Sequence, residues 1–183
     1  QTAYMRANYP VEFMAAVMSV AIGNTDKVVS DLTECRRAGI SVVPPDVNRS
    51  VRDFSVTTLE DGREAVLFGL GAIRNVGDGP INSILAAREE QPDGVFASLD
   101  AMCAALDWDA VSRRVMEGLA KAGALDTFGH RGAIMANLDR AISAGQSQFK
   151  AKARGQIGLF GGDDESIRIQ SAAPLSGPIM DQM

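Results

Sequence analysis

Residues 69–88 read GLGAIRNVGDGPINSILAAR, and this stretch decides how the middle of the chain folds. Four glycines surround a short apolar segment, with a strand-like run before it and a helix-like run after it. Glycine-rich turns that open a helix often bind phosphate, because unpaired backbone N–H groups point outward at the helix N-terminus. Two alternatives follow: the stretch binds the phosphates of a nucleotide cofactor, or it binds the backbone of DNA.

A nucleotide cofactor fits the spacing poorly. A dinucleotide fingerprint requires G-x-G-x-x-G within a strand–helix–strand unit, and Arg74 stands where the third glycine should follow Gly69 and Gly71. The acidic residue expected about 20 residues later at a strand end is replaced by EEQPDGVFASL, which reads as a loop. A P-loop would need a Lys directly after its last glycine, and none stands there. These mismatches argue against a nucleotide-binding enzyme.

The spacing favours a helix-hairpin-helix instead. We predict a short helix over residues 70–74, a tight turn NVGDG over residues 75–79, and a second helix over residues 80–88. Asn75 and Gly77 tolerate the positive φ that such a turn needs. The hypothesis competes with a plain turn between helices that binds no ligand.

In the helix-hairpin-helix interpretation, the N–H groups at the start of the second helix bind one phosphate without reading a base. Val76 packs inward between the helices, and Arg74 adds a positive charge. The Asp78 carboxylate opposes the phosphate, since it competes as a local cap. The residues predicted to contact DNA here are Arg74, Asn75, Val76, Gly77, Asp78 and Gly79.

A second helical pair is predicted over residues 98–123, SLDAMCAALDWDAVSRRVMEGLAKAG, with Ser98 and Ser112 as helix caps. Its turn has no glycine, so it is a degenerate hairpin. Arg113 and Arg114 stand in the first turn of the second helix, where the helix dipole disfavours cations unless an anion is near. They are therefore secondary candidates for phosphate contact, with a solvated helix face as the alternative.

The remaining pattern predicts an α+β fold, mostly helical, with short helices and one β-hairpin. Pro10 suits the first position of a helix over residues 10–22 and Thr25 the N-cap of another over residues 25–38, with Val28, Val29, Leu32 and Cys35 as its apolar stripe. Residues 40–43 form a short strand, and two β-rich runs flank a two-residue turn at Asp61–Gly62. The last helix, from residue 131, ends at Gly145. We expect three parts: a helical region over residues 1–39, the β-hairpin with tandem helix-hairpin-helices over 40–145, and a flexible tail over 146–183.

The tail contains one compact apolar cluster, QIGLF, at residues 156–160. Charged residues flank it, basic before and acidic after, which keeps the segment soluble and exposed. Such a segment either stays loose, returns to the core, or docks on another protein.

The composition of the chain argues against several classes of protein. One His and two Cys without metal-ligand spacing argue against a zinc site, and the two cysteines are expected to be reduced core thiols. The apolar runs are too short to span a membrane, and no signal peptide is visible. The net charge of −5 argues against a strong positive potential that would attract nucleic acid. Much of the negative charge lies beyond residue 160, however, at Asp163, Asp164, Glu165 and Asp181. The chain starts with Gln1 rather than Met, so we expect a piece of a longer protein.

Five stretches follow one another in order over residues 1–162: YMRANYPVEFMAAVMS, ECRRAGISVVPPDVNRS, FGLGAIRNVGDGPINSILAAR, RRVMEGLAKAGALDTFGHRGAIM and GQIGLFGG. Together they resemble the alpha, or catalytic, subunit of bacterial DNA polymerase III. The resemblance implies that residues 1–39 end the fingers region and that residues 40–145 hold duplex DNA. It also implies that QIGLF binds the sliding clamp, or beta subunit: Gln156 anchors its polar end, Leu159 and Phe160 enter an apolar pocket, and Ile157 is an auxiliary contact.

The same resemblance implies DNA-directed DNA synthesis by the parent protein, in the cytoplasm and together with other replicase subunits. The family's metal-binding carboxylates and their Mg²⁺ lie in a region upstream of Gln1, so this fragment is expected to hold no cofactor and to be inactive alone. Asp163 and Asp164 have no strand to hold them as a replacement. The alternative is a non-catalytic interaction module whose hairpins are purely structural.

Overall fold

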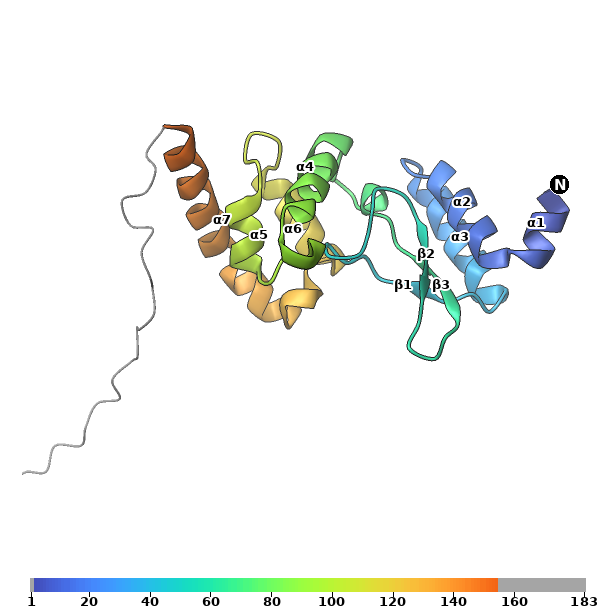
Figure 1. Ribbon diagram of the computed structural model, residues 1–183. Coiled ribbons are helices and arrows are strands. Elements are labelled where there is room, and N and C mark those ends of the chain that lie inside the picture. Colours follow the sequence, from blue (N-terminus) through green and yellow to red (C-terminus); the bar gives the residue numbers. More distant parts are fainter. Residues whose placement is uncertain (1, 155–183) are drawn as a thin grey trace, which may run out of the picture.

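The described residues, 2–154, of this computed structural model form a row of helices interrupted by one small sheet (Figure 1). The α-helices are α1 (Thr2–Asn8), α2 (Pro10–Val20), α3 (Thr25–Arg37), α4 (Asp78–Glu89), α5 (Leu99–Ala105), α6 (Arg113–Ala122) and α7 (Arg131–Ala153). The strands are β1 (Val42–Val43), β2 (Ser55–Thr58) and β3 (Glu64–Leu67), and the 3-10 helices are η1 (Leu70–Ala72), η2 (Pro92–Gly94) and η3 (Asp126–Phe128). The predicted fold class, mostly helical α+β, is confirmed.

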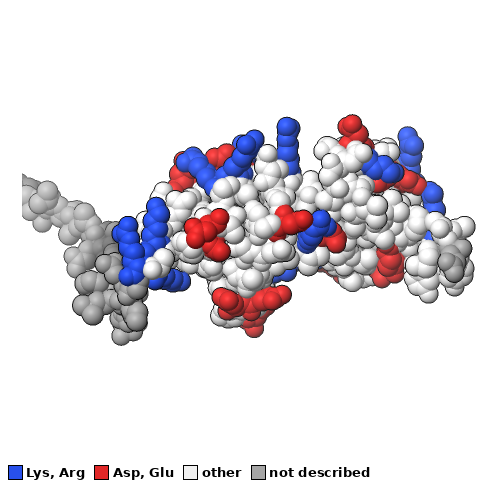
Figure 2. Space-filling model, turned by 90° about the horizontal axis from the view of Figure 1, so that it is seen from above, with Lys and Arg blue, Asp and Glu red and all other residues white. Residues whose placement is uncertain are grey.

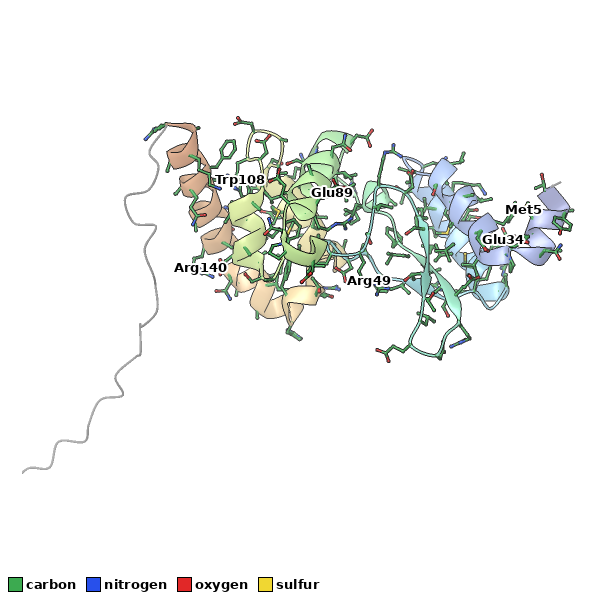
Figure 3. The ribbon with its side chains drawn as sticks, in the orientation of Figure 1. Met5, Glu34, Arg49, Glu89, Trp108 and Arg140 are labelled. Atoms are coloured by element: carbon green, nitrogen blue, oxygen red, sulfur yellow. The ribbon has the colours of Figure 1, made fainter. Side chains whose placement is uncertain are left out.

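The first hydrophobic core lies between α2, α3 and the sheet. Met14, Met18, Cys35 and Val66 are among its buried side chains. Pro10 stands at the first position of α2, as predicted, because its missing N–H is not needed there. Val29, predicted in the buried stripe of α3, is instead 55% exposed. α1 buries none of its residues and is joined to α3 by an ion pair between Arg6 and Glu34 (Figure 3).

The cap of α3 differs from the prediction by one residue. Asn24, not Thr25, is the N-cap, and its side-chain oxygen accepts a hydrogen bond of 3.1 Å from the N–H of Lys27. We expect Asn24→Ala to lower the free energy of unfolding by about 1 kcal/mol, because that N–H loses its partner. Thr25→Ala should cost clearly less. Urea denaturation of both variants measures the difference, and a larger loss in Thr25→Ala would contradict the assignment.

The sheet has the strand order β1-β3-β2, with β1 parallel and β2 antiparallel to β3. The predicted hairpin is present, but its turn is longer than two residues. The N–H of Leu59 donates to the Arg63 carbonyl, which leaves a three-residue loop with Gly62 at φ +82°. Three-residue hairpin loops of this kind consist of a type I turn followed by a residue with positive φ. Gly62 supplies that residue, so the glycine is needed in this loop as well, although the loop is one residue longer than predicted.

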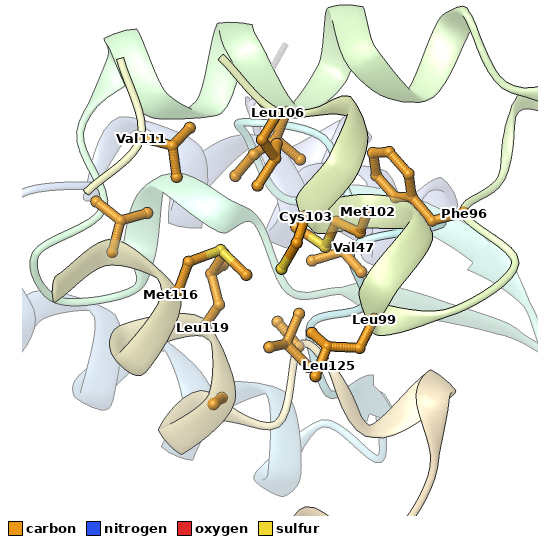
Figure 4. Packing of buried hydrophobic residues seen from close by; sticks show 14 of the residues in the cluster. Val47, Phe96, Leu99, Met102, Cys103, Leu106, Val111, Met116, Leu119 and Leu125 are labelled. Atoms are coloured by element: carbon orange, nitrogen blue, oxygen red, sulfur yellow. The ribbon is translucent and has the colours of Figure 1, made fainter. Parts of the chain in front are cut away.

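The second core lies between α4, α5, α6 and α7 (Figure 4). Met102, Cys103, Met116 and Leu119 are all fully buried within it. Both cysteines are free and buried, as expected. Burial raises the pKa of the Cys103 thiol to about 12, so this side chain stays neutral at physiological pH.

α7 does not end at Gly145 but continues to Ala153. Residues 146–153, predicted as the start of the tail, are therefore helical. Gly145 is buried, and a Cβ placed on it would overlap the carbonyl oxygen of Cys103 in α5. The glycine thus allows two helices to approach closely and does not mark a helix end. Arg140 adds an ion pair of 3.0 Å from α7 to Asp100 of α5 (Figure 3).

In the described part of the chain, no helix combines the length and the apolar character needed to cross a membrane.

Candidate nucleic-acid interface

The first hairpin links η1 to α4 and differs in detail from its prediction. The short helix is a single 3-10 turn, and α4 begins at Asp78, two residues before the predicted start. Asn75 has φ +68°, as predicted, but Gly77 is extended, with φ −93° and ψ 175°.

Val76 is buried, with 6% of its surface exposed, and its inward packing is confirmed. A Cβ placed on Gly118 of α6 would lie 3.0 Å from the Arg74 carbonyl oxygen and 3.6 Å from the Val76 side chain. The hairpin is therefore seated on α6. This contact leaves the other side of the turn, residues 77–79, exposed to solvent.

The N–H groups of the turn are arranged as a row of donors at the start of α4. The N–H of Val76 donates to Ile73 and that of Ile81 to Gly77. Between them, the N–H groups of Gly77, Asp78 and Gly79 donate to no other residue in the range 2–154. A Cβ placed on either glycine would meet nothing within 4 Å. Three unpaired donors on a helix N-terminus, open to solvent, form an arrangement that suits an anion. We call residues 77–79 the cradle.

The two preceding glycines have a different purpose from the one that their spacing suggests. A Cβ on Gly69 would lie 2.5 Å from the Asp53 carbonyl carbon, and one on Gly71 would lie 3.0 Å from the Arg52 carbonyl oxygen. The N–H of Gly71 donates to that same oxygen at 2.9 Å. These glycines therefore permit backbone-to-backbone packing against the loop before β2.

Asp78 does not act as a local cap. Its Oδ1 accepts a hydrogen bond of 2.6 Å from Nε of Arg52, and the Arg52 guanidinium also donates to Asp53 at 2.6 Å. These two carboxylates raise the pKa of Arg52. The pairing of Arg52 with Asp78 was missed at the sequence level, because the residues are 26 positions apart and only the packing of two loops brings them together.

Arg74 is exposed and forms no ion pair with any residue in the range 2–154. It lies at the rim of an open groove of about 710 Å³ between α3 and the hairpin, lined by Val29, Leu32 and Ile73 among others. Its charge is therefore available to a ligand that approaches the turn.

The second hairpin joins α5 to α6, and the predicted caps are confirmed. Ser98 accepts a hydrogen bond from the N–H of Ala101, and Ser112 accepts one from Val115. In place of glycine, Asp107 closes the turn: its side chain accepts from the N–H of Asp109 at 2.9 Å. Trp108 donates to the Cys103 carbonyl and lies beside α5 (Figure 3).

The two arginines of this hairpin differ in availability. Arg113 pairs with Glu117 at 3.0 Å and with Asp139 at 2.7 Å, so its charge is already shared within the protein. Arg114 is exposed and has no ion-pair partner among the residues that the structure describes. Of the two predicted phosphate contacts, Arg114 is the one without an ion pair to any residue in the range 2–154.

Charge on the surface is mixed. Figure 2 shows Lys and Arg beside Asp and Glu over most of one face, with basic residues gathered at the end of α7, where Lys150 and Lys152 lie. No cluster of His, Cys, Asp and Glu suited to a metal ion is found within residues 2–154. The predicted clamp-binding residues, Gln156, Ile157, Leu159 and Phe160, lie outside the described residues.

Comparison with known proteins agrees with this geometry. A family model described as a helix-hairpin-helix motif matches residues 39–134. The DNA polymerase III subunit alpha of Vibrio cholerae is 44% identical over 162 residues, which is 88% of this chain and 14% of that protein. The same subunit of Pasteurella multocida is 41% identical over 97% of this chain and 15% of the relative, and that of Thermus aquaticus is 42% identical over 96% and 14%. The chain thus spans about a seventh of the length of these relatives.

Proposed function

The chain belongs to the helix-hairpin-helix family, and from this premise we propose that it contacts the backbone of duplex DNA as part of a bacterial replicative DNA polymerase. The observation that carries the proposal is the cradle: three exposed N–H groups at the start of α4 that donate to no residue in the range 2–154. A phosphate placed there accepts hydrogen bonds from the backbone N–H groups, and the positive end of the helix dipole stabilises its negative charge.

Recognition of this kind reads the backbone and not the bases. Backbone N–H groups are the same whatever the sequence, so the contact positions duplex DNA without selecting it. Arg74 adds charge at one side of the cradle and Arg114 is a second donor on the neighbouring hairpin. This suits a polymerase, which must hold the duplex that it has just made whatever its sequence.

We assign nucleotidyl transfer to the whole polymerase and not to this segment. In this proposal the catalytic carboxylates and their Mg²⁺ belong to another region of the polymerase. The segment would work in the cytoplasm with the other subunits of the replicase. Its own part is to hold DNA and, through QIGLF, to tether the polymerase to the sliding clamp.

The tether acts through effective concentration. Gln156 would anchor the polar end of the motif, with Leu159 and Phe160 as apolar anchors and Ile157 as a weaker contact. A polymerase joined to a clamp that encircles DNA rebinds the primer end before it diffuses away. Two weak contacts, one to DNA and one to the clamp, then give long residence on the template.

Salt dependence of duplex binding tests the DNA contact. We expect the chain to bind a short duplex at low salt, with an affinity that falls steeply as salt rises because each phosphate contact releases counterions. Arg74→Ala should weaken binding equally for all sequences and reduce the slope of log K against log salt by about 1. Fluorescence anisotropy measures both.

The matched control is Arg63→Ala, which also removes one arginine but at the tip of the β-hairpin, where Arg63 pairs with Asp61. It should leave the slope close to that of the unchanged chain. Absence of duplex binding at low salt would favour the alternative, an interaction module with purely structural hairpins. Binding of a mononucleotide in place of duplex would point to a nucleotide-binding enzyme.

A further inference from the structure

The acidic residue of the cradle is held by an arginine from a different loop. Asp78 is the first residue of α4, and its side chain is 67% exposed. Its carboxylate does not bond to the N–H groups beside it but to Nε of Arg52 at 2.6 Å. Nη1 of the same guanidinium donates to Asp53 at 2.6 Å. Arg52 therefore bridges two carboxylates at the edge of the cradle.

The position of Arg52 is determined by backbone packing. The N–H groups of Leu70 and Gly71 donate to the carbonyls of Val51 and Arg52, at 2.8 and 2.9 Å. On the other side, Arg88 of α4 donates to the carbonyls of Val47 and Ser50, at 3.0 and 2.8 Å. The loop that carries Arg52 is therefore held both to the hairpin and to α4, and its guanidinium stays within reach of the cradle.

The formal charge around the cradle is balanced. Arg52 and Arg74 carry two positive charges, and Asp53 and Asp78 carry two negative ones. A guanidinium binds a carboxylate and a phosphate through the same N–H donors, so the two anions compete for it. Because the pair with Asp78 is exposed to water, it contributes little stability, and a phosphate can replace the carboxylate at small cost.

We propose that Asp78 is a built-in competitor of the DNA phosphate. It holds Arg52 while the cradle is empty, and it yields Arg52 to the phosphate when duplex DNA is bound. Arg52 is then a further DNA-binding residue, and Asp78 sets how strongly the hairpin holds the backbone. Because Asp78 competes for Arg52, the hairpin binds the phosphate more weakly than it would without this carboxylate. Weaker binding allows the duplex to dissociate and move along the protein. This inference rests on the proposed DNA contact.

The test is Asp78→Asn, which keeps the shape of the side chain and removes its charge. We expect affinity for a short duplex to rise about tenfold at about 50 mM salt, because no carboxylate competes for Arg52 any longer. The slope of log K against log salt should stay close to that of the unchanged chain, because Arg52 contacts the phosphate in both complexes. Asp61→Asn is the matched control, because it removes the same charge from an exposed Arg63 pair on the β-hairpin tip. It should change neither the slope nor, beyond a small general effect, the affinity.

A second test, in an Arg52→Gln variant, distinguishes the release of Arg52 from a general effect of removing a negative charge. With Arg52→Gln already present, Asp78→Asn should lose most of its gain, since no guanidinium is left to release. Thermal unfolding checks that each variant is folded. An equal gain from Asp61→Asn, or a full gain without Arg52, would overturn the proposal. So would duplex binding by the unchanged chain with no gain in Asp78→Asn, which leaves the DNA contact standing. If neither protein binds duplex at low salt, the proposed function falls as well.

Discussion

Replacing Gly145 by alanine should lower the free energy of unfolding by about 3 kcal/mol. The added Cβ would overlap the carbonyl oxygen of Cys103 and lie 2.8 Å from its carbonyl carbon. Both are backbone atoms of α5, so the clash cannot be relieved by turning a flexible side chain. The two helices would have to separate, and the packed core between them would loosen.

The direction of this effect is informative because helix propensity predicts the opposite. Alanine is more favourable than glycine inside a helix by about 1 kcal/mol. Gly79→Ala is the matched control, since Gly79 also lies in a helix but a Cβ there would meet nothing within 4 Å. It should be neutral or slightly stabilising. Urea denaturation measures both, and a stabilising Gly145→Ala would show that α7 does not approach α5 this closely.

The double change Leu159→Ala with Phe160→Ala should abolish binding to a bacterial sliding clamp, with a loss of more than about 100-fold. The two residues are the apolar anchors of the proposed motif, and truncating anchors that fill a pocket removes most of the affinity of a short peptide segment. Calorimetry with purified clamp measures the loss. Affinity for duplex DNA should not change, because the DNA contact is assigned to the hairpins.

Leu175→Ala with Ile179→Ala is the matched control, as it removes two apolar side chains from the same end of the chain outside the motif. Clamp binding should survive it. If the unchanged chain does not bind the clamp, the tether proposal fails and the DNA contact stands on its own test. An equal loss of DNA binding in the Leu159 and Phe160 variant would show that the two functions are not divided as proposed.

Local patterns were enough to predict most of the elements. Ser98 and Ser112 cap their helices as expected, Pro10 opens α2, and Asn75 takes positive φ. Each of these depends on the chemistry of a residue and its near neighbours in the chain. The helix-hairpin-helix over residues 70–88 was predicted for the same reason, and the match to the family model covers it.

The error at Gly145 occurs where a neighbour distant in sequence decides the outcome, whereas the shifted cap of α3 and the longer hairpin turn are local errors of one or two residues. Gly145 reads as a helix end, yet it lies inside α7 because Cys103 approaches it from α5. For Gly69 and Gly71 the sequence argued against a nucleotide site but predicted no role, and the structure shows that they accommodate the backbone of Arg52 and Asp53. A glycine shows that space or an unusual φ is needed, but the sequence does not say which.

The sequence by itself therefore determined the helices, the hairpin and the family, because periodicity, caps and turns act over a few residues. Only the tertiary structure decided which of the arginines are engaged in ion pairs within the protein. It pairs Arg113 with Asp139 and Arg52 with Asp78, and it leaves Arg74 and Arg114 without an ion pair among the residues described. Ion pairs form between side chains that the fold brings within a few ångströms, and nothing in their spacing along the chain records that distance.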